Sequence, residues 1–594
     1  MALSSSGEMS GNTAADAVPE TAVREQLARI VESPRLIPSV RLCRFLTHIV
    51  NRTLSGDLDC LKEFSIAMEV FDRTSSYDPN VDAIVRVEAR RLRTKLKEYY
   101  EGPGRNDPVL IGLRPGSYVP IFRRLDAQPQ SPRRERGAEV EAGVSVAVLP
   151  FVNMSPEPEQ DFFCDGITEE IINSLSHIPG LKVIARSSAF QFKGMSVDMR
   201  DVGRRLEADV IIEGSVRKAG EKLRITVQAV QTESGHDLWS EVFRSELLDI
   251  FAVQEEIARS VAALLRSHPP AVRPRAQPSA RDLEAYTRFL RARFLIHQQS
   301  PETLQAAVEQ LRELTHAFPD YALAYSGLAA ACGFLSLFGV VSGRDVYPEV
   351  KTNAERGYAL DPHSGETCTI LGGLRGWFEH RWDEALKLYD RAMELQPGHA
   401  PAHFFRGMAL LCQANIPAAE TALCRSIELD PLSASDCARL AYLHYVKGDH
   451  RLATEHLQKS FELDRDFPEA IFYKGLLEFQ QQDYDAVVEC LRLARDPLEI
   501  GLLAAASARQ GNRKQAEKCL QKLRRLATNR YITPLAEALA AIGLQDLDLA
   551  FQRLDEAIDH KTNFVNLLAV EPFFHPLRND CRFRMLLKRL NLSG

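Results

Sequence analysis

The sequence predicts a multidomain protein: an N-terminal α+β domain, a central α/β domain and a C-terminal all-α superhelix of paired helices. Three observations support this prediction. The C-terminal half repeats every 34 residues, the middle alternates apolar strands with helices, and two proline-bearing breaks separate the parts. At 594 residues the chain is too long for one hydrophobic core, because single cores stop growing at roughly 250–300 residues.

Two polar, proline-bearing segments set the expected domain boundaries. The first lacks apolar periodicity, and the second holds four prolines that make a stiff spacer. The expected parts are a disordered tail (1–20), an N-terminal domain (21–124), a linker (125–142), a central domain (143–266), a proline-rich linker (267–280) and a repeat region with a C-terminal cap helix (281–594).

Small residues recur every 34 positions in the C-terminal half. The phase is kept by Gly373, Gly407, Ala441 and Gly475. Small side chains at fixed points allow paired helices to approach closely. The pattern resembles the tetratricopeptide repeat, with four well-phased units that begin near Glu366, Ala400, Ala434 and Pro468. Such a stack is a scaffold that holds a partner.

The resemblance to this family implies which side chains line the concave face of the stack. In each unit the first helix turns its fifth, ninth and twelfth positions inward. The large members of that set are Trp377, Phe404, Met408, Tyr442, Tyr445, Phe472 and Phe479. We expect them to form a groove for an apolar peptide, a partner helix or the central domain folding back. The alternative is that some of them pack under a neighbouring helix.

The N-terminal domain contains a basic helix between about residues 81 and 100. Apolar residues at helical spacing predict one buried stripe: Val85, Ala89, Leu92, Leu96 and Tyr99. The basic residues around it are Arg86, Arg90, Arg91, Arg93, Lys95 and Lys97. Two short strands are expected next, over 109–113 and 118–122, with Arg114 in the turn between them. A basic helix beside a hairpin can enter a major groove, with arginines on phosphates or guanine edges. A solvated helix face is the alternative.

The run VRVEARRLRTKLKEYY, followed by PVLIGLRPGSYVPIF, resembles the recognition helix and wing of the OmpR-type winged-helix family. The resemblance covers about residues 24–124. It implies a set of DNA-facing side chains: Arg86, Arg90, Arg93 and Lys97 on the helix and Arg114 on the wing. The acidic receiver domain of response regulators is absent, so phosphorylation is not the implied input. A winged helix that only docks proteins is the alternative.

The central segment alternates strands and helices. SVAVLPF is expected to be a buried strand, and residues 223–229 alternate apolar and polar side chains as a half-exposed antiparallel strand does. The run from AVLPF through CDGITEEII and LKVIARSSAFQFKG to LRITVQAVQ resembles the TolB-like amino-terminal domain, a packing and docking module, over about residues 143–265.

Four polar residues of this segment allow two interpretations. The residues are Asp165, Glu169, Arg186 and Ser187. They would form a small-ligand pocket at strand ends, or they would serve as capping, turn and surface residues, with Asp165 as a helix cap. We favour the second interpretation, because a fold does not by itself imply a site.

The sequence shows no catalytic signature. It lacks GxxxxGK[ST], a GxGxxG after a strand, HExxH and GxSxG. The 11 cysteines contain no CxxC pair and are expected to be reduced thiols. Proteins of this layout sometimes carry a class III nucleotide-cyclase domain, but its metal-binding aspartates have no matching segment here. We therefore predict a protein that is not an enzyme, with no catalytic residues, cofactor or metal.

These patterns together predict a cytoplasmic bacterial DNA-binding regulator of transcription whose repeats recruit a protein partner. The net charge of −7 is small for this length, and neither a membrane span nor a secretory signal is evident. The order of the three modules resembles the invasion-gene activators of enteric bacteria. The alternative is a protein-binding scaffold or adaptor that has no DNA target and uses the N-terminal domain for docking.

Overall fold

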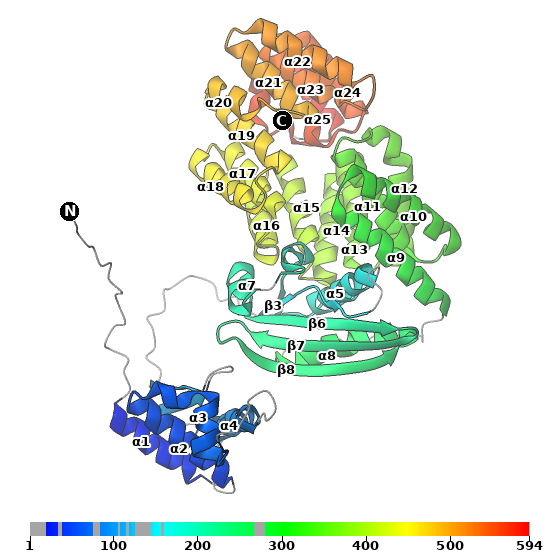
Figure 1. Cartoon of the computed structure of the whole chain (residues 1–594). Coiled ribbons are helices and arrows are strands. Elements are labelled where there is room, and N and C mark those ends of the chain that lie inside the picture. Colours follow the sequence, from blue (N-terminus) through cyan, green and yellow to red (C-terminus); the bar gives the residue numbers. More distant parts are fainter. Residues whose placement is uncertain are drawn as a thin grey trace, which may run out of the picture. The chain divides into compact units, whose positions relative to one another are not determined.

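The computed structural model describes residues 19–33, 39–74, 84–101, 103–104, 107–113, 118–124, 144–155, 160–195, 197–265 and 280–592. The chain divides into two compact units, residues 1–139 and 140–594. Figure 1 shows the first in blue and the second in cyan to red. The predicted central domain and repeat region therefore belong to one unit.

The first unit consists of helices followed by a β-hairpin. Its elements are α1 (Glu20–Val31), α2 (Val40–Leu54), η1 (Leu58–Leu61), α3 (Glu63–Phe71), α4 (Ile84–Glu101), β1 (Val109–Leu113) and β2 (Pro120–Arg124). The two strands are antiparallel, and Gly112 lies opposite Ile121. The predicted order of a long basic helix and then a hairpin is confirmed. The tip of the hairpin, which includes Arg114, lies outside the described residues.

The core of the first unit forms under the apolar stripe of α4. Val85, Ala89 and Leu92 have no exposed surface, and Leu96 and Tyr99 are 4% and 3% exposed. These side chains belong to one cluster with residues of α1, α2, α3 and β1. The stripe predicted from helical spacing is therefore buried. Its burial fixes which side of α4 faces away from the core.

The α/β domain, residues 144–265, contains a mixed sheet. Its strands are β3 (Ser145–Val148), β4 (Val152–Asn153), β5 (Lys182–Val183), β6 (Val210–Ala219), β7 (Lys222–Gln231) and β8 (His236–Glu246). The order is β5-β3-β6-β7-β8, with β4 beside β6. β3 is parallel to β5 and β6, whereas β6, β7 and β8 form an antiparallel meander. Gly220 and Gly235 in its turns have φ of 61° and 68°, backbone that glycine adopts without strain.

Helices cover one face of this sheet fully and the other in part. They are α5 (Asp161–Ser176), α6 (Arg186–Ala189), α7 (Met199–Leu206) and α8 (Ile250–Leu264), with η3 (Phe190–Phe192) and η4 (Leu247–Asp249). α5 and α8 pack on one face. α7 packs on the other face at the start of β6, together with Leu432 of the repeat region. The far end of that second face, near Gly220, carries exposed side chains.

Two helix starts in this domain show which aspartates cap a helix. α5 begins at Asp161, so Asp165 lies inside the helix and the predicted capping role is wrong. Asp198 does cap α7, because its Oδ1 accepts a hydrogen bond from the backbone N of Arg200 at 3.0 Å.

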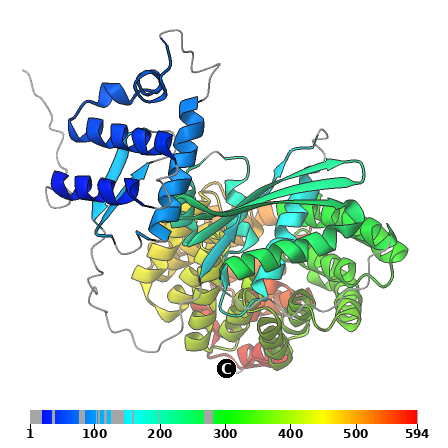
Figure 2. The same cartoon turned by 90° about the horizontal axis from the view of Figure 1, so that it is seen from below.

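The repeat region is a curved array of helices (Figures 1 and 2). The first part contains α9 (Ala280–Gln298), α10 (Pro301–Ala317), α11 (Ala322–Leu337), α12 (Gly343–Leu360), α13 (Gly365–Gly373), η5 (Leu374–Phe378), α14 (Trp382–Leu395), α15 (Ala400–Cys412) and α16 (Ile416–Leu429). The second part contains α17 (Ala434–Lys447), α18 (His450–Leu463), α19 (Pro468–Gln480), α20 (Tyr484–Cys490), α21 (Pro497–Arg509), α22 (Arg513–Leu526), α23 (Pro534–Gly543), α24 (Leu547–Asp559), η6 (Asn563–Leu567), η7 (Pro572–Leu577) and α25 (Cys581–Arg589). No described helix is both long enough and apolar enough to cross a membrane.

Helix starts follow the 34-residue period seen in the sequence. The second helices of four successive pairs begin at Trp382, Ile416, His450 and Tyr484, each 34 residues after the last. The first helices of three pairs begin at Ala400, Ala434 and Pro468 with the same step. The predicted repeat units are therefore confirmed as helix pairs.

Close packing explains some of the small residues in this period but not all of them. A Cβ on Gly407 would lie 2.8 Å from Cγ of Leu423, and one on Gly475 would lie 2.9 Å from Cδ2 of Leu502. A Cβ on Gly373 would meet nothing within 4 Å, whereas its neighbour Gly372 lies against the ring of Tyr389. The first repeat therefore makes its close approach one residue earlier than the period predicts.

Candidate nucleic-acid interface and repeat groove

The exposed side of α4 carries two arginines of the predicted DNA-binding helix. Arg86 and Arg91 expose 53% and 69% of their side chains. Val87 lies between them in sequence and is 51% exposed. Its position two residues after the buried Val85 places Val87 off the apolar stripe, which is the one signal of its exposure in the sequence. An exposed apolar side chain on such a face could contact a thymine methyl group.

Both exposed arginines form ion pairs within the first unit. Nε of Arg86 lies 3.1 Å from Oε1 of Glu63, and Nη1 of Arg91 lies 3.0 Å from Oε1 of Glu88. The pair of Arg86 is largely exposed, and exposed ion pairs contribute only about 0–1 kcal/mol to stability. A phosphate group can therefore compete for Arg86 at little cost to the fold. The side chain of Glu88 is only 7% exposed, so the loss of Arg91 as its partner costs more.

Arg93 has a different environment from the one the sequence predicts. It is partly buried, and its Nε donates a hydrogen bond to the carbonyl oxygen of Leu113 at 3.2 Å. Burial lowers the pKa of Arg93 from its ordinary value. Arg93 thus joins α4 to the end of β1 and positions the hairpin, which corrects its predicted place among the exposed residues of the helix.

The other predicted DNA-binding residues are only partly defined. Lys95 is half-buried. The side chains of Arg90 and Lys97 and the whole of Arg114 lie outside the described residues. The described part of the predicted interface is therefore the Arg86, Val87 and Arg91 surface, with Arg93 behind it.

The predicted partner groove is occupied by the C-terminal segment of the chain itself, residues 560–592. Of the seven predicted lining residues, Met408, Tyr442, Tyr445 and Phe472 are at most 5% exposed. The other three, Trp377, Phe404 and Phe479, are partly buried in the same cluster. The expectation of an open apolar groove is therefore corrected, because the chain supplies its own occupant.

A buried carboxylate holds this segment in the groove. Oε2 of Glu571 accepts a hydrogen bond from the Tyr442 hydroxyl at 2.6 Å, and Oε1 accepts one from the Tyr445 hydroxyl at 2.6 Å. The backbone N of Phe573 also donates to Oε1, at 2.9 Å. Burial raises the pKa of Glu571, although these hydrogen bonds oppose the shift by favouring its charged form. The arrangement satisfies a carboxylate that would otherwise be costly to bury.

Aromatic contacts and backbone hydrogen bonds extend the attachment on both sides of Glu571. Phe564 meets the ring of Phe472 edge-on at 5.4 Å, and Phe573 lies 4.7 Å from the ring of Phe479. Nε1 of Trp382 donates to the carbonyl oxygen of Leu590 at 2.9 Å. The segment therefore contacts the array over most of its length, which is the behaviour of a core element.

The polar residues considered for a ligand pocket in the α/β domain instead contact the repeat region or each other. Both carboxylate oxygens of Asp165 lie 2.7 Å from Nζ of Lys193. Glu169 lies 3.2 Å from Nε of Arg186, 3.4 Å from Nε of Arg293 and 3.1 Å from Nε2 of His297. Burial opposes the ionisation of Glu169, but the charges of Arg293 and His297 outweigh it and lower its pKa.

The loop between α16 and α17 completes this contact. The hydroxyls of Ser187 and Ser188 each donate to Asp430, and the hydroxyl of Ser188 accepts a bond from the backbone N of Leu432 at 2.8 Å. Glu169 and Ser187 therefore belong to an interface with the repeat region, whereas Asp165 pairs with Lys193 and Arg186 pairs with Glu169 inside the α/β domain. The interface could not be found from sequence, since the partners of Glu169 and Ser187 in the repeat region lie more than 100 residues away.

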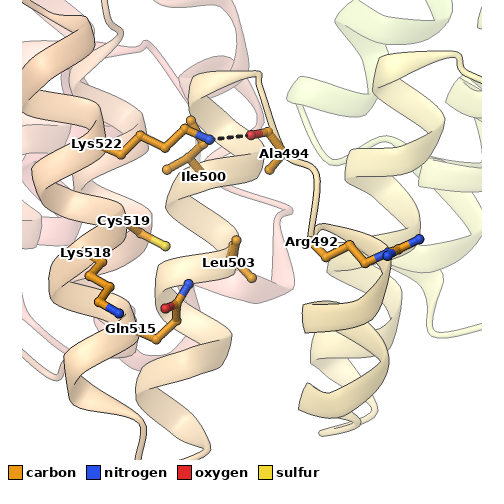
Figure 3. Close-up of a pocket in the computed structure, with 8 residues that line it drawn as sticks. All are labelled: Arg492, Ala494, Ile500, Leu503, Gln515, Lys518, Cys519 and Lys522. Atoms are coloured by element: carbon orange, nitrogen blue, oxygen red, sulfur yellow. Dashed lines mark hydrogen bonds between the residues drawn. The ribbon is translucent and has the colours of Figure 1, made fainter.

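The described residues offer little that resembles a reaction site. A pocket of about 150 Å³ lies between the turn after α20 and the helices α21 and α22 (Figure 3). Lys522 at its border donates to the carbonyl oxygen of Ala494 at 2.7 Å. Burial raises the pKa of the Cys519 thiol in the same pocket, which disfavours the reactive thiolate. In the described ranges, no three His, Cys, Asp or Glu side chains gather in a way that could hold a metal ion.

Comparison with known proteins places the α/β domain near a group of regulators. Residues 142–260 match a family described as HilA/YgeH-like transcriptional regulator, second domain. The chain is 21% identical over 326 residues to the transcriptional regulator HilA of Salmonella typhimurium, and the match covers 53% of this chain and 57% of that protein.

A second curated relative carries a different name. The chain is 39% identical over 204 residues to "Putative adenylate cyclase 3" of Rhizobium meliloti, and the match covers 34% of this chain and 35% of that protein. The chain therefore spans about a third of the length of this relative and just over half of the length of HilA.

Parts of this chain are also similar to solved structures. One is a thermophilic TPR protein of Thermus thermophilus, with a TM-score of 0.28 and 18% identity, covering 32% of this chain and 97% of that chain. Another is the APC/C hetero-tetramer Cut9-Hcn1, with a TM-score of 0.34 and 17% identity, covering 58% of this chain and 59% of that chain. Scores this low do not establish a shared fold, and the helix pairs described above rest on the chain's own structure.

Proposed function

We propose that this chain is a DNA-binding transcriptional regulator whose first unit binds duplex DNA through α4 and the β1–β2 hairpin. In this proposal the first unit is a winged helix of OmpR type and the α/β domain is a TolB-like connector. The repeat region recruits a protein partner, and the protein works in the cytoplasm. The match to the HilA/YgeH-like second domain supports the regulator class.

The observation that carries the proposal is the arrangement of α4. One side of the helix is fully buried, and the other presents Arg86 and Arg91 to solvent with the exposed Val87. Arg93 fixes the hairpin to the helix through the Leu113 carbonyl. A basic helix with a rigidly attached hairpin can place guanidinium groups in the major groove and the hairpin on the adjacent backbone.

For the repeat region, we propose that a partner binds outside the space filled by residues 560–592. The filled groove disfavours the simpler idea of a partner lying on Tyr442 and Tyr445, since Glu571 already uses both hydroxyls. The groove residues could contact a partner only if residues 560–592 left the array.

A scaffold without a DNA target remains the second candidate. Internal ion pairs at both exposed arginines favour it, because they satisfy the guanidinium groups without any ligand. The name of the Rhizobium meliloti relative belongs to that protein, and the chain spans about a third of its length. We do not propose a cyclase activity for this chain.

Selection of duplexes from a random library by the full chain separates the two candidates. The regulator proposal predicts enrichment of a sequence family, which disappears in the Arg86→Glu/Arg91→Glu double variant. A Lys514→Glu/Arg524→Glu variant of α22 makes the same change in net charge on exposed residues elsewhere and should keep the enrichment. If the unchanged chain enriches no sequence, the regulator proposal is wrong and the protein-binding scaffold is the better account of its function.

A further inference from the structure

Three arginines lie side by side on the open part of the sheet in the α/β domain. Arg217 of β6 lies opposite Arg224 of β7, and Arg224 lies opposite Arg244 of β8. Directly opposite residues of antiparallel strands point to the same face. All three side chains are exposed. We call this set the arginine row; it crosses β6, β7 and β8, which Figure 1 shows as neighbouring long strands.

The arginine row is unfavourable for the fold by itself. Like charges directly opposite each other destabilise a sheet. No described acid lies within 4.0 Å of the nitrogens of Arg217, Arg224 or Arg244. Nε of Arg217 donates to the carbonyl oxygen of Met154 at 3.1 Å, which does not neutralise its charge.

The sequence around the row adds further positive charge. Residues 217–224 read RKAGEKLR, with Glu221 as the one acid among them. Lys222 lies on the same face as the row, whereas Lys218 lies on the opposite face, with its Nζ over the ring of Phe163. Glu246 lies opposite Lys222 on β8. The end of the β6–β7 hairpin is therefore a local cationic surface, although the whole chain has a net charge of −7.

The location of the row leaves it accessible within the second unit. α7 and Leu432 cover the same face of the sheet at the start of β6, around Ile211. The arginine row lies six residues further along β6, beyond this cover. Cations that repel one another on an uncovered face can be neutralised by an anionic partner that bridges them.

We propose that the arginine row is a second DNA contact, which binds the phosphate backbone of duplex DNA. This inference rests on the proposed function. Neighbouring strands are about 4.8 Å apart, so the row spans about 10 Å, a length over which a duplex presents several phosphates. An evenly spaced row without a pocket suits a repeated backbone charge, which positions a protein without reading sequence.

The test is fluorescence anisotropy of the full chain on a 30-base-pair duplex, with salt varied, for Arg217→Gln/Arg224→Gln/Arg244→Gln. The proposal predicts a loss of affinity on the order of tenfold or more. It also predicts that the slope of log affinity against log salt becomes shallower by about 2–3, because roughly 0.9 is lost per phosphate contact. The melting temperature should stay the same or rise, since three repelling charges are gone.

A matched variant, Lys514→Gln/Arg524→Gln/Arg525→Gln on exposed positions of α22, controls for the change in net charge. Equal slopes for the arginine-row and α22 variants would overturn this inference and leave the face to another anionic partner, such as an acidic protein. The same salt titration of the Arg86→Glu/Arg91→Glu variant distinguishes failure of this inference from failure of the proposed function. If that variant abolishes binding while the arginine-row variant matches the control, the proposed function stands alone; if neither changes binding, both proposals fall.

Discussion

At the scale of single residues, the second unit contains buried carboxyl groups that accept hydrogen bonds from hydroxyl groups. Glu571 has no exposed surface and is held by two tyrosine hydroxyls and one backbone N–H. A buried acceptor that loses a donor keeps its full desolvation cost. The tyrosines of the predicted groove therefore act in folding.

The Tyr445→Phe variant tests this role. It removes one of the three donors to Glu571, and we expect the free energy of unfolding to fall by about 1–3 kcal/mol. Tyr484→Phe is the control, because no described residue accepts a hydrogen bond from the Tyr484 hydroxyl. The comparison needs chemical denaturation of both variants at one pH. Equal stability of the two variants would mean that Glu571 does not need Tyr445.

Asp436 gives a prediction of pH dependence. It accepts hydrogen bonds from the hydroxyls of Ser426 and Ser433. The pKa of Asp436 is raised to about 7, mainly by burial and secondly by the nearby charge of Asp430. Between about pH 4 and pH 7 the folded chain therefore binds a proton that the unfolded chain releases. Stability from this group is greatest at low pH and is lost as the pH rises through 7.

The Asp436→Asn variant should lose this pH dependence of stability, because asparagine does not titrate. We expect the melting temperature of the variant, relative to that of the unchanged chain, to be higher at pH 8 than at pH 5. Other titrating groups cancel in the difference between the two proteins. A difference that does not vary with pH would show that Asp436 does not change its protonation state in this range.

At the scale of elements, the 34-residue period determines which helices pair, while local contacts determine how close they come. Gly407 and Gly373 occupy equivalent positions in the period, yet only Gly407 lies against a neighbour, Leu423. The same residue type therefore has different physical roles in successive repeats.

Alanine at these two positions should have opposite effects. Gly407→Ala forces its Cβ against Leu423 and should destabilise the unit by about 1–3 kcal/mol. Gly373→Ala adds a Cβ in open space on helical backbone and should be neutral or stabilise by up to about 1 kcal/mol. Thermal unfolding of both variants checks this. Similar destabilisation by both would contradict the packing described here.

Periodic elements could be predicted from sequence because their spacing is local information. The buried stripe of α4, the strand alternation around Ile225 and the helix pairs all follow from periods of 3.6, 2 and 34 residues. The start of α5 could not be placed, because Asp165 has the chemistry of a cap but lies within the helix and pairs with Lys193. Side-chain chemistry alone did not reveal that tertiary partner.

At the scale of the whole molecule, the sequence predicts modules but not their contacts. The groove residues around Tyr442 lie in one cluster, but residues 560–592 fill the space between them. The contact of Glu169 with Arg293 likewise joins the α/β domain to α9 across more than 100 residues of chain. Neither contact leaves a periodic signal, so each required the folded structure.

The central claim is that α4 binds DNA. Its most direct test is the salt dependence of full-chain affinity for a duplex recovered by selection, compared with that of Arg86→Glu/Arg91→Glu. We predict that the unchanged chain loses affinity steeply as salt rises, by about 0.9 per phosphate contact on a log–log plot. The variant should bind more weakly and show a shallower slope. An affinity that does not respond to salt and is the same in both proteins would contradict the claim.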